Sequence, residues 1–401
     1  MQAAKVDFIP DGTVTFPKGF SAGATFAGIF KKTKYNLDLG ILFSEVPCIA
    51  TGLFTSNRIK SAPVLLSQDR LKNGRATALI VNSGCANACT GERGLSDAAE
   101  MAALAARSIA TTPEDVLVAS TGVIGQPLPM ELIRTGIRQI VLSKDGGHEL
   151  ARAIMTTDTV PKETAVSFGI GDSKFIIGGI AKGSGMIHPN LGTMFCFLTT
   201  DAMLELSSLR AVLREAVDSS FNMISIDGDT SPSDTVLLMA NGLAGKKPIS
   251  PEIFQQALAQ VCVHLAKAIA RDGEGATKLI EVTVNGAINL AEARMAARTI
   301  VGSPLVKSAV HGADPNWGRI ITASGRSGVE LTESKIDLNI GDVNVVKRGS
   351  PQPFDMTNVI QILKKDEVPI SLHFNLGNAS ATAWGCDLSE EYVTINSQYL
   401  T

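Results

Sequence analysis

The sequence predicts a mixed α/β protein in which sheets and helices form layers. Short apolar runs that suit buried strands alternate along the chain with segments of helical periodicity. The composition, 45% hydrophobic and 19% charged, is that of a globular chain with ample material for a core. The length of 401 residues allows about two or three domains, and no repeat or low-complexity linker separates them.

Apolar runs, prolines and capping residues predict the elements of the first half. Residues 78–81 form an expected strand that leads into a loop at 82–91. Ser96 has the side chain of a helix N-cap, and an alanine-rich helix is expected from there through residue 110. The other elements expected before residue 181 are a single turn at 112–115, a strand at 116–119, a helix at 130–142 and a strand at 175–180.

The second half continues the alternation of strands and helices. One predicted helix carries an apolar face made of Leu209, Val212, Leu213, Ala216 and Val217. Ser250 and Pro251 mark the start of another helix. Its apolar stripe consists of Phe254, Leu258, Val261, Leu265 and Ile269. Strands are expected at residues 236–240, 279–284, 335–340 and 369–374.

The stretch at residues 181–202, AKGSGMIHPNLGTMFCFLTTDA, joins a glycine-rich turn to a predicted core strand. Gly192 and Thr193 directly precede the apolar run at 194–198. Glycine permits strained backbone angles, so the Thr193 hydroxyl could attack the preceding carbonyl and form an ester. Hydrolysis of that ester would leave Thr193 as a new N-terminus whose own amine serves as a base. On these residues alone, however, the pattern more often marks only the start of a strand, because threonine is a common strand residue.

Separate blocks spread over essentially the whole chain share one resemblance. They are KGSGMIHPNLGTMFCFLTTDA (182–202), NSGCANACTG (82–91), STGVIG (120–125), MTTDTVPK (155–162), DGDTSPSD (227–234), RDGEGATK (271–278), DPNWGRI (314–320) and NSQYLT (396–401). The set resembles the ornithine acetyltransferase family, the glutamate N-acetyltransferases of arginine biosynthesis, and the first block resembles the family's cleavage region. Because many blocks agree in the expected order, the resemblance is specific.

The resemblance implies roles for particular residues. Thr193 matches the nucleophile that follows the cleavage point at Gly192. Thr121 and Gly122 match the pair that stabilises the negative oxygen of the tetrahedral intermediate. The remaining matched positions hold the amino-acid substrate, and they are Thr156, Lys182, Glu274, Asn396 and Thr401. Lys182 suits a carboxylate and Glu274 suits an ammonium group, whereas Thr156 could exchange roles with its neighbour Thr157.

The resemblance also implies a fold and a reaction. The fold would be two stacked β-sheets flanked by helices, similar to the N-terminal-nucleophile proteins, with a smaller helical or αβ lobe. Self-cleavage would give pieces 1–192 and 193–401, intertwined in one catalytic unit, and two of each would form a heterotetramer. The acetyl group would pass from N2-acetylornithine to Thr193 and then to glutamate, in two steps. No cofactor or metal is implied; acetyl-CoA is a candidate second acetyl donor that no residue decides.

Three positions depart from the family pattern. Gly192 stands where alanine is most frequent, and a glycine tolerates the geometry of cleavage. Cys85 stands where asparagine is usual, in a loop whose role the sequence does not reveal. Pro232 and Ser233 replace the more familiar Thr-Asn, and we expect only a local change of turn there because Asp227 and Asp229 remain.

Charge and targeting signals limit the partners and the location. The net charge is −3, from 36 basic and 39 acidic residues, which does not imply a surface for nucleic acid. The segment at residues 1–20 lacks the marks of a signal or transit peptide, and no uninterrupted apolar run approaches the length of a membrane span. We therefore expect a cytoplasmic protein with small-molecule substrates and no membrane partner.

The six cysteines and five histidines show no spacing typical of a metal site. The cysteines, at 48, 85, 89, 196, 262 and 386, are expected as reduced and mostly buried thiols. The glycine-rich stretch at 183–185 does not match a phosphate-binding loop, because no Gly-Lys-Ser/Thr triplet closes it.

Other functions remain open at this point. The chain could be an acyltransferase of the same family in a specialised pathway, or an amidase or aminopeptidase on the same self-cleaved scaffold. The KGSGM and DPNWGRI blocks favour the transferase. A binding protein without catalysis is a further alternative, against which the presence of Thr121, Lys182, Thr193 and Glu274 argues.

Overall fold

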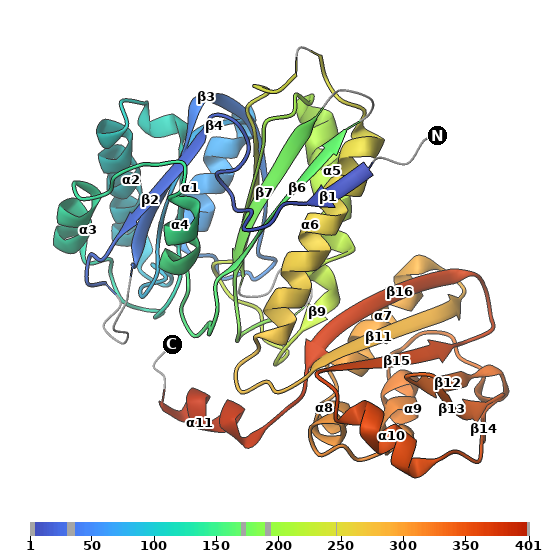
Figure 1. The fold of residues 1–401 in the computed structure, drawn as a ribbon. Coiled ribbons are helices and arrows are strands. Elements are labelled where there is room, and N and C mark those ends of the chain that lie inside the picture. The colour runs from blue at the N-terminus through green and yellow to red at the C-terminus, as the bar shows by residue number, and fades with distance from the viewer. Residues whose placement is uncertain (1–4, 30–36, 170–173, 189–193, 246, 399–401) are drawn as a thin grey trace.

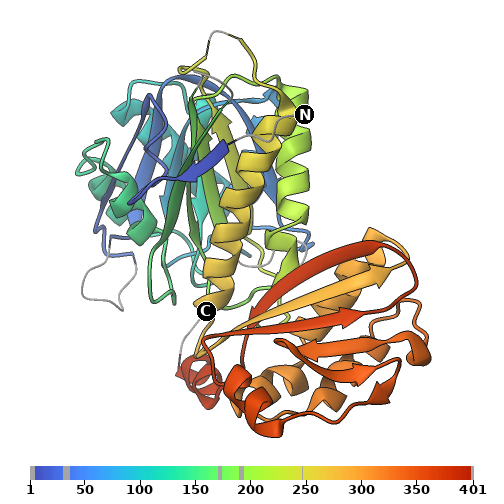
Figure 2. The same cartoon turned by 45° about the vertical axis from the view of Figure 1, so that its right-hand side comes forward.

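The protein has two lobes, each built on its own β-sheet (Figures 1 and 2). The computed structural model describes residues 5–29, 37–169, 174–188, 194–245 and 247–398. Gly192, Thr193 and Thr401 therefore lie outside the described residues. The expected mixed α/β class with two sheets and covering helices is confirmed.

The first lobe is built on a nine-stranded sheet in which strands run in the order β1-β6-β7-β8-β10-β3-β4-β5, and β2 pairs with β3. Its strands are β1 (Lys5–Phe8), β2 (Phe20–Thr25), β3 (Leu39–Phe54), β4 (Arg75–Asn82), β5 (Val116–Ser120), β6 (Lys162–Gly169), β7 (Phe175–Lys182), β8 (Phe195–Thr200) and β10 (Thr235–Ala240). β5, β8 and β10 are buried along their whole length, and β4, β6 and β7 along most of theirs, which explains their continuous apolar runs.

Two strands from the second half of the chain complete the middle of this sheet. β8 pairs antiparallel with β7, with Phe195 opposite Lys182, and parallel with β10, with Phe195 opposite Thr235. β10 in turn pairs antiparallel with β3. The first sheet therefore interleaves segments from before and after residue 193.

The second lobe carries a seven-stranded sheet in the order β14-β13-β12-β15-β11-β16-β9. Its strands are β9 (Ile224–Ser225), β11 (Leu279–Ala287), β12 (Asp337–Ile340), β13 (Val343–Lys347), β14 (Ser350–Pro351), β15 (Glu367–His373) and β16 (Ala379–Cys386). Helix α7 packs on β11 and β16. The smaller lobe expected from the resemblance is thus an αβ unit (Figure 1).

The helices cover the sheets and connect the lobes. They are α1 (Ala62–Arg70), α2 (Gly91–Ser108), α3 (Met130–Ile137), α4 (Gly147–Ala153), α5 (Leu206–Asp218), α6 (Pro251–Arg271), α7 (Leu290–Val301), α8 (Pro304–His311), α9 (Trp317–Gly325), α10 (Met356–Leu363) and α11 (Glu390–Gln398). The last of these, α11, follows β16 and returns the chain toward the first lobe (Figure 1).

Helix α6 lies between the two sheets and belongs to the common core. It packs on β6 and β7 of the first sheet and on β16 of the second. By length and composition it could cross a membrane, with a mean hydropathy of 1.2. Its apolar stripe is instead buried in the protein, where Phe254, Val261 and Leu265 are each 0% exposed. The core therefore accounts for the apolar character of this helix.

Two expected helix boundaries were wrong. Helix α2 begins at Gly91 and not near Ser96, because the left-handed residues Asn87 and Cys89 turn the chain into the helix earlier. Helix α3 ends at Ile137 and not at residue 142. The chain turns after it because Ser143 pairs with Ala22 on β2 through two backbone hydrogen bonds. In contrast, the expected turn at 112–115 and the strands at 116–119 and 236–240 lie within one residue of the observed elements.

All six cysteines are free thiols, as expected. Five are buried, and only Cys89 is exposed. Burial raises the pKa of Cys196 and of Cys386, so these thiols are protonated and act as small apolar side chains.

Candidate active site

A pocket lies where the carboxyl ends of β5 and β7 meet helix α11. It brings together the described residues that the family resemblance singled out, namely Thr121, Gly122, Thr156, Lys182, Glu274 and Asn396. Thr157, which the sequence offered as an alternative to Thr156, also lines it. The other lining residues were not assigned a role from the sequence: Ala86, Ile124, Gly185, Met186, Asp227, Asp229, Ser231, Ser233 and Tyr392.

Thr121 and Gly122 follow β5 and form one end of the pocket. The backbone N–H of Thr121 donates to the carbonyl of Asn82 over 3.1 Å, so it is occupied within the protein. The Thr121 hydroxyl accepts a weak hydrogen bond from Lys182 Nζ at 3.5 Å. Its own hydrogen is then available to a ligand. Of the two donors that Thr121 could offer, the structure therefore favours the hydroxyl.

Gly122 is glycine for two reasons. Its φ of +125° lies in the region that side chains disfavour. A Cβ built there would lie 2.4 Å from the carbonyl carbon of Gly84 and 2.7 Å from the nitrogen of Cys85. The loop that contains Cys85 thus forms the wall behind Gly122, a role that the sequence did not reveal. The Cys85 thiol points to the carbonyl of Gln126 at 3.3 Å.

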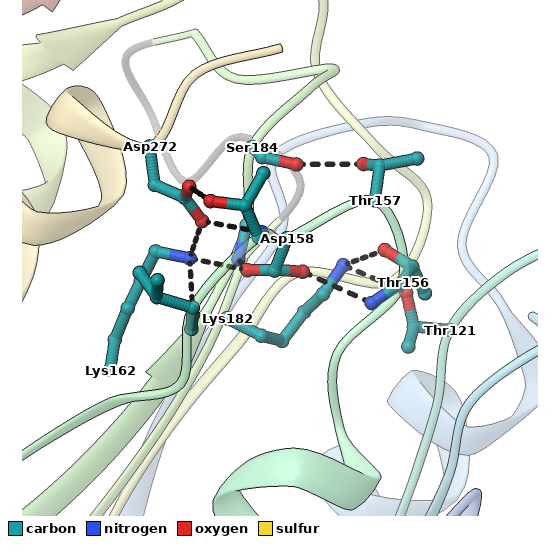
Figure 3. A network of polar contacts seen from close by, with 11 residues as sticks. Thr121, Thr156, Thr157, Asp158, Lys162, Lys182, Ser184 and Asp272 are labelled. Carbon is teal, nitrogen blue, oxygen red and sulfur yellow. Dashed lines mark hydrogen bonds and ion pairs between the residues drawn. The ribbon is translucent and has the colours of Figure 1, made fainter. Parts of the chain in front are cut away.

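Lys182 ends β7 and is 2% exposed. Its Nζ donates to the Thr156 hydroxyl at 2.8 Å (Figure 3). Thr156, and not Thr157, is therefore the threonine beside this amine, since Thr157 pairs with Ser184 at 2.7 Å. Burial lowers the pKa of Lys182, the carboxylate of Asp158 opposes this shift, and Lys162 lowers it further.

Glu274 provides the opposite charge in the pocket. It is 8% exposed, and its Oε2 accepts a hydrogen bond from Asn396 Nδ2 at 2.7 Å. Its backbone N–H donates to the carbonyl of Ser184 at 2.8 Å, which ties the loop after α6 to the loop after β7. Gly185 lies directly against the carboxyl group, because a Cβ there would be 2.5 Å from the Glu274 carboxyl atoms. A cation on one wall and an anion on another suit a zwitterionic ligand.

Asp227 shapes the floor of the pocket. Its carboxylate accepts the backbone N–H groups of Met186 at 2.5 Å and Ile187 at 2.9 Å. Burial raises the pKa of Asp227, and these N–H donors oppose that shift. Met186 has a φ of +56°, and this strained backbone lies next to the site, where such strain is often found. The Pro232 carbonyl accepts the N–H of Ser61, so the altered turn at 232–233 is held against the segment before α1.

Asp234 lies beside the start of β8. It is fully buried, and its Oδ1 accepts the backbone N–H of Met194 at 3.0 Å. Burial raises the pKa of this carboxyl well above its usual value. Met194 directly follows Thr193 in the sequence. Asp234, directly before β10, and Lys182, at the end of β7, therefore flank the beginning of β8 from its two sides.

Behind the pocket lies a cluster that the sequence did not predict, which we call the buried ion triad (Asp158, Lys162 and Asp272). Lys162 Nζ lies 2.6 Å from Asp158 Oδ1 and 2.6 Å from Asp272 Oδ2 (Figure 3). The three side chains are at most 8% exposed. Burial alone would raise the pKa of Asp158, but Lys162 and Lys182 hold it below its usual value. The block MTTDTVPK contained two of these residues but gave no sign of their partner.

Comparison with known proteins connects this site to a family. The family model described as ArgJ matches residues 21–401. A protein of Dehalococcoides mccartyi (strain CBDB1), named arginine biosynthesis bifunctional protein ArgJ, is 53% identical over 403 residues, which cover 99% of this chain and 100% of the relative.

Solved structures are similar over parts of the chain. The arginine biosynthesis bifunctional protein ArgJ of Bacillus halodurans is 48% identical with a TM-score of 0.50, covering 51% of this chain and 98% of that one. An ornithine acetyltransferase of Mycobacterium tuberculosis, solved with ornithine, is 39% identical with a TM-score of 0.42, covering 46% of this chain and 98% of that one.

Proposed function

The chain belongs to the ArgJ family, and from this premise we propose that it transfers an acetyl group from N2-acetylornithine to glutamate. It is an acyltransferase of arginine biosynthesis. The observation that carries the specific reaction is the pocket in which Lys182 and Glu274 face one ligand space next to Thr121 and Gly122. Both substrates are small amino acids with charges at their ends, and both products share that character.

The nucleophile in this proposal is Thr193, freed by cleavage of the bond after Gly192. The Thr193 hydroxyl adds to the Gly192 carbonyl, its proton leaves, the nitrogen gains a proton and the C–N bond breaks. Water then hydrolyses the ester, which gives a carboxylate on Gly192 and a free amine and hydroxyl on Thr193. Support comes from the pairing of Phe195, two residues further on, with Lys182 of the pocket.

The transfer then takes two chemical steps. The Thr193 oxygen attacks the acetyl carbonyl of acetylornithine while its own amine, with a usual pKa near 7.7–8.0, accepts the hydroxyl proton. The Thr121 hydroxyl and the Gly122 N–H donate to the negative oxygen that forms. Ornithine leaves with the proton from the amine, and an acetyl ester remains on Thr193. The amine of glutamate attacks this ester, which releases N-acetylglutamate and restores the hydroxyl.

The two pieces, 1–192 and 193–401, would form one intertwined unit. Support comes from the first sheet, in which β8 and β10 lie between β7 and β3. The matched chain of the Bacillus halodurans protein also supports two pieces, because 98% of it corresponds to only 51% of this chain. We further propose that two such units pair into a heterotetramer in the cytoplasm. Acetyl-CoA is a candidate second donor of the acetyl group.

The decisive experiment follows the polypeptide and the acetyl group together. Purified protein should run as two bands on a denaturing gel, and Thr193→Ala should run as one. Incubation with acetylornithine alone should add one acetyl mass to the 193–401 piece, and double-reciprocal plots should give parallel lines. Active wild-type enzyme with a single band, or intersecting lines without an acetylated piece, would refute the mechanism. Product formation from acetyl-CoA and glutamate alone tests the second donor.

A further inference from the structure

The buried ion triad lies behind the pocket and does not line it. Two carboxylates and one ammonium group leave a net charge of −1 in a place almost without solvent. A buried ionic group of this kind contributes little net stability, because desolvation of the charges offsets their attraction. Its contacts with the loops that carry the pocket residues indicate a different role.

Asp158 connects the triad to the surroundings of Lys182. Its Oδ2 accepts the backbone N–H of Thr156 at 3.0 Å. Its Oδ1 accepts the backbone N–H of Gly183 at 2.6 Å as well as Lys162 Nζ. One carboxylate thus holds two backbone groups in place (Figure 3): that of Thr156, whose hydroxyl accepts the hydrogen bond from Lys182, and that of Gly183, directly after Lys182.

Asp272 connects the same triad to Glu274. Its oxygens accept the Thr159 N–H at 3.0 Å and the Thr159 hydroxyl, so the loop after α6 is fastened to the loop before β6. Glu274 follows two residues later in that loop. Lys162, which bonds to both carboxylates, is therefore the link between the backbone around Lys182 and the backbone around Glu274.

We propose that the buried ion triad is a positioning network that sets the separation of Lys182 and Glu274 and the charge of Lys182. The inference rests on the proposed function, in which these two residues hold the ends of one amino acid. In this view the triad determines which substrates bind, because it sets the distance between charged ends that the pocket accepts. None of its members touches the substrate.

The electrostatic side of the network concerns the charged groups around Lys182 in the described part of the chain. These groups are Asp158 from the loop before β6, Lys162 from β6, Asp234 directly before β10 and Glu274 from the loop after α6. Burial lowers the pKa of Lys182, Asp158 raises it and Lys162 lowers it. Loss of the Asp158 charge should therefore lower the pKa of Lys182 further, whereas loss of the Lys162 charge should raise it.

The test compares Asp158→Asn and Lys162→Met with wild type. The measurements are the KM for acetylornithine as a function of pH, kcat, and the affinity for ornithine by calorimetry. Both variants should raise KM by roughly tenfold with a smaller change in kcat. The pH at which binding weakens, as Lys182 loses its proton, should move down by about one unit in Asp158→Asn and up by about one unit in Lys162→Met. A merely structural role would not move the two profiles in opposite directions.

A third variant separates spacing from charge and guards against misfolding. Thr159→Val removes the exposed hydroxyl donor to Asp272 and keeps every charge. It should raise KM severalfold while leaving the pH profile in place. The control is Lys267→Met. It removes the ion pair between Lys267 Nζ and Glu281 Oε2, which are 3.2 Å apart and do not line the pocket, so KM and its pH profile should stay unchanged.

The outcomes are distinct from those of the proposed function. If wild type does not acetylate glutamate, the proposed function fails. The affinities of wild type and the variants for ornithine then still show whether the triad positions Lys182 and Glu274. If wild type is active but the two charge variants show unshifted profiles, or shifts in the same direction, the network does not set the charge of Lys182. Unchanged KM and affinity in Thr159→Val would overturn its role in spacing.

Discussion

The two walls of the pocket differ in how firmly the protein holds them. The strand-end wall consists of Thr121 and Gly122 after β5 and Lys182 at the end of β7, and Thr121 and Lys182 are at most 3% exposed. The tail wall consists of Tyr392 and Asn396 on α11, a helix in which no residue is buried. Groups at the ends of buried strands cannot move without disturbing the sheet, whereas an exposed terminal helix can move more freely.

This difference matches two tasks. Donors that stabilise a transition state act best when they are already in place, because no energy is then needed to orient them during the reaction. In the proposed mechanism the pocket accepts first acetylornithine and then glutamate, and a wall that serves both benefits from some freedom. The comparison therefore leads us to expect large effects on kcat from the strand-end wall and small effects on KM from the tail wall.

The largest expected effect tests the rigidity of the strand-end wall at Gly122. In Gly122→Ala, the new Cβ meets the backbone of Gly84 and Cys85 and the φ of +125° is strained, so the donor must move. We expect kcat to fall by roughly 10³. Gly125→Ala is the matched control, because Gly125 has a φ of +81° but no atom within 4 Å of the added carbon. Its kcat should stay near wild type, and equal losses in both variants would contradict the steric argument.

The next test sharpens the role of the Thr121 hydroxyl. Thr121→Val keeps the shape of the side chain and removes the hydroxyl, so kcat should fall by roughly 10²–10³ with little change in KM. Thr121→Ser retains the donor and should recover most of the rate. Steady-state kinetics of the two variants decide the point. If the serine variant is as slow as the valine variant, the Thr121 hydroxyl is not the donor to the negative oxygen.

A smaller effect is expected where the two walls meet, at Gly185. In Gly185→Ala the added methyl group would lie 2.5 Å from the Glu274 carboxyl atoms, so this flexible side chain must shift. A displaced charge should raise KM for both amino acids by roughly tenfold and leave self-cleavage intact. Gly325→Ala, at a position with no atom within 4 Å of the added carbon, is the control. Unchanged KM in Gly185→Ala would remove Glu274 from the binding site.

The smallest effect is expected from the tail wall. Asn396→Ala removes the hydrogen bond to Glu274 Oε2 and should raise KM about twofold to tenfold, since a typical hydrogen bond contributes about 0.5–1.5 kcal/mol net. The control Ser397→Ala removes a bond within the same helix, to the Thr394 carbonyl, and should have no effect on KM. A loss of kcat as large as that of Thr121→Val would break the comparison, because it would make the tail wall part of the catalytic apparatus.

Strands with uninterrupted apolar runs were predicted well from the sequence, and strands with interruptions were not. β5 and β10 fit because their short runs are buried on all sides. The 16-residue strand β3 was missed. It contains Pro47, which cannot donate to a ladder, and the strand tolerates it through a shift of register between Phe43 and Cys48. A bulge of this kind depends on the neighbouring strand, which the local sequence does not contain.

The candidate site shows the same limit. The resemblance named residues far apart in the chain, and the structure brings its described members into one pocket. It gave no hint of the buried ion triad, because Lys162 and Asp272 are separated by 110 positions and only the packing of α6 on β6 brings them together. Likewise, the role of the loop at Cys85 became visible only through its contact with Gly122.

The placement of β8 and β10 inside the first sheet has a consequence for exchange between molecules. Each of these strands is hydrogen-bonded along both edges, to β7 and β3 on the outside and to each other between. If the chain is cleaved before residue 193, the two pieces could not exchange with those of another molecule unless the centre of the sheet unfolded. Isotopically heavy and light enzyme, mixed for days under native conditions, should therefore yield no hybrid units, and the association of the halves should last as long as the fold itself.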